Sequence, residues 1–172
     1  PLAVEANRVV LTRAGSEYSV SSKTYVASLA ALHLLGTILT HQDQDRSRVE
    51  LEHAANAMEN YLADWNEYVD DLSALFQDVE TIVLVGRGAS LAAVGAGALI
   101  IREAARVPCL DLSSAAFRHG PMELISSRLF ALVFRGTAPT TGQNERLVSD
   151  VRAAGGGAEL VQESTLGNAF AL

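Results

Sequence analysis

The sequence contains a single cysteine, Cys109, among its 172 residues, so no disulfide can form within the chain. A chain without a disulfide framework is typical of a reducing compartment, and we therefore expect a cytoplasmic protein. Cys109 follows Pro108 in an apolar, strand-like run. This context predicts a buried core thiol rather than a nucleophile.

Long apolar runs and targeting features are also missing. The longest apolar run, Val94 to Ile101, is interrupted by glycines and is too short to span a bilayer. The first residues show no basic segment followed by an apolar one, so we expect no signal peptide. The chain opens on Pro1 rather than on methionine, and we expect a fragment of a longer protein or a processed product.

Basic residues are scarce. The 13 Lys and Arg residues stand against 20 Asp and Glu residues, and the formal net charge is −7. Nucleic acids and anionic membranes favour clustered cations, so we expect neither as a partner. A small anionic substrate stays open, because helix N-termini and hydroxyl groups bind phosphate without a positive net charge. Apolar residues make up 49% of the chain, which is enough for a packed core.

The first 78 residues carry mainly helical patterns. Arg8 to Thr12 is a short β-branched run that predicts a strand, and a polar loop follows it. Thr24 to Leu39 is apolar on nearly every face, which predicts a buried helix. After a polar break, residues 49–76 carry apolar side chains at helical spacing. This spacing predicts an amphipathic helix or a bent pair of helices.

From residue 79 onward, short apolar runs alternate with helical patterns. Strands are predicted for four runs: Thr81 to Val85, Cys109 to Leu112, Leu129 to Phe134 and Ala158 to Val161. Helices are predicted for Ser90 to Arg106 and Asn144 to Ala154, and a turn or short helix for Ser114 to Met122. The alternation predicts an α/β fold of three layers, in which helices cover both faces of a parallel sheet.

The first predicted strand of this half ends in the turn Gly86-Arg87-Gly88-Ala89-Ser90. Glycines between a strand and a helix let a ligand approach the backbone, and the N-terminus of the following helix favours anions. A dinucleotide fingerprint would need a third glycine where Leu91 stands, although Asp111 could reach a ribose. A nucleotide-binding domain and a plain strand-to-helix turn therefore both remain as alternatives.

Glu103 ends a helical face that also carries Ala92, Ala96 and Leu99. This face is small and apolar, so we expect it to pack closely against another surface. A carboxylate at its end would be partly desolvated, which would make it a better general base. The alternative is a helix-end carboxylate that pairs with a neighbouring arginine.

Two further segments offer groups for binding or proton transfer. His119 precedes Gly120 and Pro121, which can hold it rigidly, and a histidine can move protons near neutral pH; a surface histidine is the alternative. The loop Glu17 to Lys23 offers serine hydroxyls, backbone N–H groups at the start of the next helix, and Lys23. These groups could cradle a phosphate, or Ser21 and Ser22 could be ordinary helix caps.

Four motifs in one order resemble the double-SIS (sugar isomerase) family. The segment Glu17 to Tyr25 is similar to a segment of the first SIS domain. The segments Val83 to Gly88, Gly97 to Glu103 and Phe117 to Pro121 are similar to the second SIS domain. The resemblance covers most of the chain and is closest to the isomerase half of glucosamine-6-phosphate synthase and to amino-sugar-phosphate deaminases and isomerases.

The resemblance implies a three-layer αβα domain of the flavodoxin-like or Rossmann-like kind, joined to a helical connection. It implies that Glu103 is the base that moves a proton between C1 and C2 of an open-chain sugar. It also implies that His119 opens the sugar ring and comes from the neighbouring subunit of a homodimer. The expected substrate-binding residues are Val20, Ser21, Ser22, Lys23, Gly86, Gly88 and Ser90. No metal and no organic cofactor are implied, and the expected ligand is a phosphorylated sugar or amino sugar.

The sequence also departs from the synthase pattern. Ala96 and Ile100 stand where the synthase has a glutamate and a lysine, and Ala116 stands where it has a glutamate before the histidine. These differences favour a phosphosugar isomerase or an amino-sugar-phosphate deaminase over glucosamine synthesis. They also leave a second hypothesis, a phosphosugar-binding regulatory module without catalysis.

The motif order predicts one and a half SIS domains. Residues 1–78 would be the C-terminal part of a first SIS domain with connecting helices, and residues 79–172 a second SIS domain without its C-terminal tail. The Ser/Thr-rich phosphate loop would precede Pro1, and a lysine-bearing tail would follow Leu172. We therefore expect an incomplete active site in the chain as given.

Overall fold

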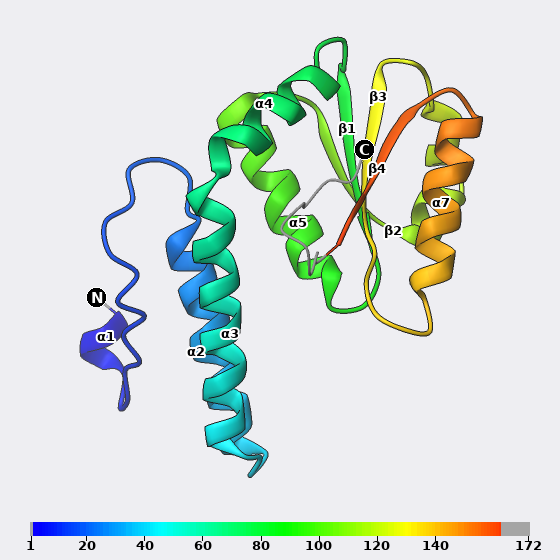
Figure 1. Cartoon of the computed structure of the whole chain (residues 1–172). Helices are drawn as coiled ribbons and strands as arrows, with labels where there is room; N and C mark the ends of the chain where they lie inside the picture. The colour runs from blue at the N-terminus through cyan, green and yellow to red at the C-terminus, as the bar shows by residue number, and fades with distance from the viewer. Residues whose placement is uncertain (1, 163–172) are drawn as a thin grey trace. The chain divides into compact units, whose positions relative to one another are not determined.

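The computed structural model describes residues 2–162 (Figure 1). The chain forms two compact units, unit 1 up to Asp64 and unit 2 from Trp65. The expected boundary between the two SIS parts, at residues 78 and 79, stays a prediction. The division into two compact units does not show where the first SIS part ends and the second begins.

Unit 1 is a helical hairpin preceded by an irregular segment. It contains α1 (Leu2–Glu5), α2 (Lys23–Leu39) and α3 (Gln44–Ala63), and α2 lies beside α3 (Figure 1). The predicted strand at residues 8–12 is wrong, because this segment has no regular secondary structure. A strand needs a partner for its backbone groups, and no strand of unit 1 is found among the described residues. Val10 and Leu11 are accordingly exposed.

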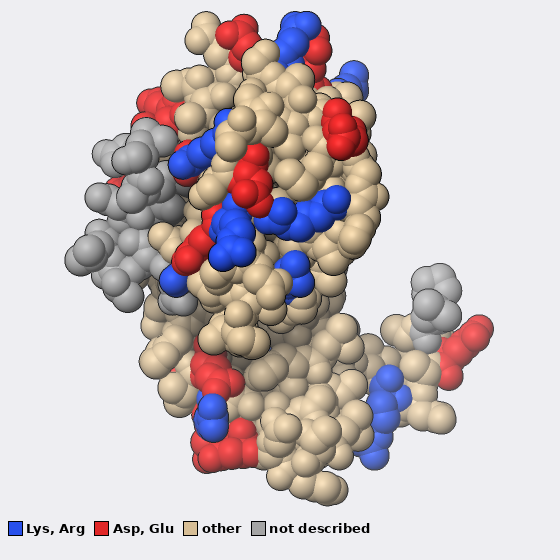
Figure 2. Space-filling model, turned by 90° about the vertical axis from the view of Figure 1, so that its right-hand side faces the viewer, with Lys and Arg blue, Asp and Glu red and all other residues tan. Residues whose placement is uncertain are grey.

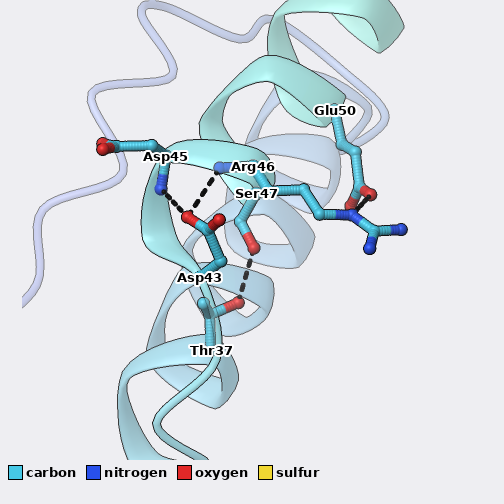
Figure 3. Close-up of polar contacts among 6 residues, drawn as sticks. All are labelled: Thr37, Asp43, Asp45, Arg46, Ser47 and Glu50. Carbon is cyan, nitrogen blue, oxygen red and sulfur yellow. Dashed lines mark hydrogen bonds and ion pairs between the residues drawn. The ribbon is translucent and has the colours of Figure 1, made fainter.

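The turn between α2 and α3 is held by side chains (Figure 3). Asp43 caps α3: its Oδ1 accepts the N–H groups of Asp45 at 3.0 Å and Arg46 at 3.1 Å. This cap starts the helix at residue 44, inside the stretch expected to be a polar break. The buried hydroxyls of Thr37 and Ser47 lie 3.0 Å apart and join the two helices next to the turn.

Unit 2 is built on a four-stranded parallel sheet. The strands are β1 (Thr81–Gly86), β2 (Cys109–Ser113), β3 (Leu129–Phe134) and β4 (Gly157–Val161). Their order is β2-β1-β3-β4, and every neighbouring pair is parallel. This order is that of the flavodoxin-like sheets and not the 3-2-1-4 order of the dinucleotide-binding fold. The predicted α/β fold with a parallel sheet is confirmed.

Helices cover both faces of the sheet, as Figure 1 shows for α5 (Ser90–Ile100) and α7 (Thr141–Ala153). Successive residues of a strand point to opposite faces, so β1 contributes to two separate cores. The face under α5 carries Ile82, Leu84, Val94, Ala98 and Cys109. The opposite face, under α6 (Ser114–Arg118) and α7, carries Val83, Val85, Phe117, Ala131, Val133, Leu147 and Val151. The predicted burial of Cys109 is confirmed.

The remaining elements connect these layers. α4 (Trp65–Leu75) opens unit 2, and a short 3₁₀ helix, η2 (Pro121–Leu124), follows α6. The helix predicted for residues 90–106 is α-helical only to Ile100 and continues as a π-helical turn, η1 (Ile101–Ala105). Arg106, which follows, has a φ of +56° and ends the helical segment.

Ion pairs tie α7 to its neighbours on the outer face of unit 2, where acidic and basic side chains intermingle (Figure 2). Arg118 pairs with Asp150 at 2.6 Å, and Arg135 pairs with Glu145 at 3.1 Å. Arg152 pairs with Glu159 and also donates to the Ala158 carbonyl. None of the helices within residues 2–162 is both long and apolar enough to cross a membrane.

Candidate functional site

The turn after β1 combines two glycines that are needed for different reasons. Gly86 is buried, and a Cβ atom at this position would lie 2.9 Å from Val94 Cγ2, so a side chain would push α5 off the sheet. Gly88 has a φ of +55°, which favours glycine. Ser90 donates its hydroxyl to the Arg87 carbonyl at 3.0 Å, at the start of α5. Packing and turn geometry therefore account for this glycine pattern without a ligand.

Arg87 carries the one polar side-chain atom that the described part of the chain buries without a hydrogen bond, its Nε. It lies in the loop between the carboxyl end of β1 and the N-terminus of α5. In open α/β sheets, ligands bind outside the carboxyl ends of the strands, at the point where the strand order reverses. In the order β2-β1-β3-β4 that point lies between β1 and β3.

A buried polar network stabilises this same edge of the sheet. Ser114 Oγ lies 2.8 Å from Asn144 Oδ1 and 3.2 Å from the Gly86 carbonyl oxygen. The Asn144 amide donates to the carbonyls of Phe134 at 2.9 Å and Arg135 at 3.1 Å. Both side chains are almost completely buried. The network therefore connects the carboxyl ends of β1 and β3 with the N-terminal turns of α6 and α7.

Sequence reasoning did not single out Ser114 or Asn144. A signal for Asn144 was present, because it shares a helical face with Leu147, Val148 and Val151, and all four are buried. A polar residue on such a face must find partners inside the protein. No comparable signal marked Ser114.

Glu103 lies in the π-helical turn η1, at the other end of the helical segment from the Gly86–Ser90 turn. Thirteen residues at 1.5 Å per residue separate Ser90 and Glu103 by roughly 20 Å. Glu103 is exposed, and no hydrogen bond or ion pair of its side chain is found among residues 2–162. The arginine that pairs nearby is Arg102, which reaches Asp111 at 2.9 Å and the Cys109 carbonyl at 2.6 Å.

The helix face that leads to Glu103 does not pack against the sheet. Val94 and Ala98 make that contact, whereas Ala92 and Leu99 are exposed and Ala96 is half-buried. The close packing expected for the face of Ala92, Ala96 and Leu99 is therefore not provided within unit 2. Single π-helical turns occur frequently at functional sites, so η1 is a local signal in favour of Glu103.

His119 ends α6 and is exposed. Its backbone N–H donates to the Ala116 carbonyl at 3.1 Å, and Gly120, with a φ of +122°, turns the chain into Pro121. The preceding Arg118 is held by its ion pair with Asp150. The backbone around His119 is thus well defined, while its ring has no hydrogen-bond partner within the described range. Unit 2 does not bring His119 and Glu103 together, because Glu103 follows α5 on one face of the sheet and His119 follows α6 on the opposite face.

In unit 1, the loop before α2 is organised by Glu17. Its carboxylate accepts the N–H groups of Ser22 at 2.8 Å and Thr24 at 2.9 Å. It also accepts the hydroxyls of Thr24 at 2.5 Å and Ser21 at 3.3 Å. The hydrogen bonds from Thr24, from its side chain first, lower the pKa of Glu17 to about 2. Two of the backbone N–H groups that were expected to be free for a phosphate are therefore occupied.

Lys23 and the Ser22 hydroxyl remain exposed beside this loop, and Val20 is half-buried. Within residues 2–162, no group of three or more His, Cys, Asp or Glu side chains could hold a metal ion. The candidate site residues therefore lie in the Val20–Lys23 loop of unit 1 and, in unit 2, in the Gly86–Ser90 turn and at Glu103 and His119.

Comparison with known proteins identifies relatives over most of the chain. The isomerizing glutamine–fructose-6-phosphate aminotransferase of Methanothermobacter thermautotrophicus is 29% identical over 153 residues, which covers 88% of this chain. The same enzyme of Thermosynechococcus vestitus is 31% identical over 129 residues, or 70% of this chain. The chain is a relative of the SIS proteins. The resemblance inferred from the motifs is thereby confirmed.

The SIS relatives are longer than this chain, which spans 25% of the first enzyme and 21% of the second. No protein-family model matches the chain.

Solved structures show the same SIS fold. The C-terminal domain of glucosamine-fructose-6-phosphate aminotransferase from Francisella tularensis has a TM-score of 0.76 and 23% identity, and the match covers 92% of this chain and 47% of that one. Glucosamine-6-phosphate deaminase from Thermotoga maritima has a TM-score of 0.72 and 19% identity, over 87% of this chain and 45% of that one. Tagatose-6-phosphate ketose/aldose isomerase from Escherichia coli has a TM-score of 0.60 and 20% identity, over 86% and 41%.

Proposed function

We propose that the chain is part of a phosphosugar aldose–ketose isomerase or an amino-sugar-phosphate deaminase, whose substrate is a phosphorylated sugar or amino sugar. The observation that carries this proposal is the similarity to isomerizing glutamine–fructose-6-phosphate aminotransferases over 88% of the chain. The fold adds support, because structural neighbours include a deaminase of glucosamine 6-phosphate and a ketose/aldose isomerase of tagatose 6-phosphate.

Following the resemblance to the SIS family, we propose that Glu103 transfers the proton. In an open-chain aldose phosphate, the Glu103 carboxylate takes the proton from C2, the C1–C2 double bond forms, and the carbonyl oxygen at C1 gains a proton. The protonated Glu103 then gives its proton to C1 while the C2 hydroxyl becomes a carbonyl and loses its own proton. The exposure of Glu103, and the absence of a side-chain partner for it within residues 2–162, support this assignment, because a base must be free to reach the substrate.

The same geometry supports a site completed by a second subunit. His119 would protonate the ring oxygen and open the sugar, and Glu103 would act after ring opening. Unit 2 does not bring the two side chains together, and the face of Ala92, Ala96 and Leu99 is not packed against the sheet. We infer a homodimer in which His119 of one subunit serves the Glu103 of the other. The protein would be cytoplasmic, act without a metal or organic cofactor, and bind the sugar through Val20–Lys23, Gly86, Gly88 and Ser90.

The second candidate is a regulatory module that binds a phosphosugar without converting it. Ala96, Ile100 and Ala116 stand at positions where ionisable groups are expected from the synthase pattern. A sensor that has lost these groups would still bind the sugar, but it would have no use for Glu103 as a base.

Proton exchange at the carbon next to the carbonyl separates the two candidates. The complete protein that contains this chain is incubated in heavy water with fructose 6-phosphate, whose C1 signals are followed by NMR, or with glucosamine 6-phosphate, whose C2 signal is followed. The isomerase or deaminase predicts exchange, which Glu103→Gln slows by about 10²- to 10⁴-fold. The control Glu50→Gln removes an exposed carboxylate from α3 and should leave exchange unchanged. Binding without exchange would establish the regulatory module, and full exchange by Glu103→Gln would contradict the assigned base.

A further inference from the structure

Glu17 lies in the irregular segment before α2, yet its carboxylate makes four hydrogen bonds. Oε1 accepts two backbone N–H groups, those of Ser22 and Thr24, and Oε2 accepts the hydroxyls of Thr24 and Ser21. The partners lie four to seven residues along the chain. A single side chain therefore closes the loop that contains Val20 and Lys23 and fixes its backbone at both ends.

The position of these bonds matters because α2 begins at Lys23. The first N–H groups of a helix have no partner inside the helix, and they attract anions. The residue before α2, Ser22, makes no capping hydrogen bond with its own side chain. The Glu17 carboxylate takes that place, and its negative charge lies where a phosphate would otherwise bind.

The charges around the loop support the same interpretation. Lys23 is exposed next to the loop and opposes the charge of Glu17, and no other acidic or basic residue lies between positions 17 and 24. The loop therefore carries no net charge at neutral pH. Its exposed polar groups include the Ser22 hydroxyl, which suits a sugar hydroxyl as a hydrogen-bond partner.

We propose that Glu17 is a positioning residue that holds the Val20–Lys23 loop in its binding conformation and closes the N-terminus of α2 to anions. In this arrangement the loop contacts the uncharged, hydroxyl-bearing part of the sugar, and the phosphate group of the sugar binds elsewhere. The identity of the ligand rests on the proposed function, whereas the closure of the helix N-terminus does not.

The closure is tested with inorganic phosphate, the full 172-residue chain and backbone amide NMR. In the unaltered chain, the amide signals of Ser22 and Thr24 should not respond to phosphate. In Glu17→Ala the two N–H groups lose their acceptor, and both signals should shift with saturation. Glu17→Gln retains an acceptor oxygen without the charge, so it should keep the loop conformation and show a weaker phosphate response than Glu17→Ala.

Glu50→Gln is the matched control, because Glu50 is an exposed glutamate of unit 1 that pairs with Arg46 at 2.9 Å, away from the loop. It should behave like the unaltered chain. A phosphate response of Ser22 and Thr24 in the unaltered chain would overturn the proposal. So would a Glu17→Ala chain that folds and shows no phosphate response.

A second measurement tests the link to the sugar. In the complete protein, Glu17→Ala should weaken the binding of fructose 6-phosphate by about tenfold or more, and Glu17→Gln should restore most of it. Equal affinity of Glu17→Ala and the unaltered protein would show that the loop does not need Glu17 to bind the sugar. If the unaltered protein binds no sugar phosphate, the proposed function fails, while the phosphate response of the two amides still decides whether Glu17 closes the helix.

Discussion

Ser114 Oγ lies 2.8 Å from Asn144 Oδ1 in the interior of unit 2, where neither side chain has access to water. Asn144 also donates to the carbonyls of Phe134 and Arg135. Because a buried polar group without a partner is costly, the two residues depend on one another. Their bonds stabilise the edge of the sheet at which the turn after β1 lies.

The first prediction concerns this pair. Asn144→Ala should lower the free energy of unfolding by about 2–4 kcal/mol, because the carbonyls of Phe134 and Arg135 lose a donor and the buried Ser114 hydroxyl loses one of its two partners. Urea unfolding followed by circular dichroism measures the change. Gln143→Ala, one residue earlier on the exposed side of α7, is the control and should change stability by less than about 0.5 kcal/mol. Equal stability of the two variants would contradict a contribution of the network to folding.

The second prediction compares two glycines of α5. A Cβ atom at Gly97 would lie 2.8 Å from Leu84 Cδ2, whereas a Cβ atom at Gly95 would meet nothing within 4 Å. Gly95→Ala should therefore stabilise the fold by about 0.5–1 kcal/mol through helix propensity. Gly97→Ala should be less stable than Gly95→Ala by about 1–3 kcal/mol, because the methyl group crowds the core between α5 and the sheet.

Thermal unfolding of the two alanine variants and the unaltered chain measures this difference. Both variants carry the same substitution in the same helix, so the gain in stability from helix propensity cancels when the two are compared. If both variants stabilised the chain equally, the close approach of α5 to β1 at Gly97 would be refuted.

The third prediction follows from the pKa of Glu17, which is lowered from 4.5 to about 2. A carboxyl group with a lowered pKa in the folded state stabilises that state above its unfolded pKa and loses this contribution as the pH falls. The N-terminal turn of α2 should therefore stay intact down to about pH 4.5 and loosen between pH 4.5 and 2. The carboxyl carbon shift of Glu17 and the Thr24 amide shift should titrate together with a midpoint near 2.

Glu17→Gln serves as the control for this titration, because an amide side chain does not ionise. Its Thr24 amide should show no transition between pH 4.5 and 2. A midpoint near 4.5 in the unaltered chain would mean that the four hydrogen bonds of Glu17 do not persist in solution.

The fourth prediction concerns Cys109. Burial raises the pKa of its thiol to about 11, so almost no thiolate is present at neutral pH. Alkylation by iodoacetamide should therefore be very slow in the folded chain and fast in urea. Since the thiol is buried against α5 and the sheet, labelling should follow the opening of unit 2. Rapid labelling of the folded chain would contradict both its burial and its raised pKa.

Local patterns in the sequence predicted most of unit 2. The apolar runs that became β1 and β3 were found to within a residue, because strands buried on both faces read as continuous apolar segments. The segment at residues 8–12 has the same local pattern and forms no strand. A strand is defined by its partner, and the local sequence does not contain that partner. The start of α3 was missed for a different reason, because the Asp43 cap is a local signal that was overlooked.

The candidate site, too, was predicted only in part from the sequence. Motif order alone was enough to relate the chain to the SIS proteins and to nominate Glu103 and His119. The tertiary structure determined which groups surround each of these residues. It placed Glu103 on an exposed π-helical turn, paired the N–H groups of Ser22 and Thr24 with Glu17, and buried Ser114 against Asn144. Residue type and spacing specify which chemistry a side chain can perform, whereas only the packed chain specifies which donors and acceptors are already taken.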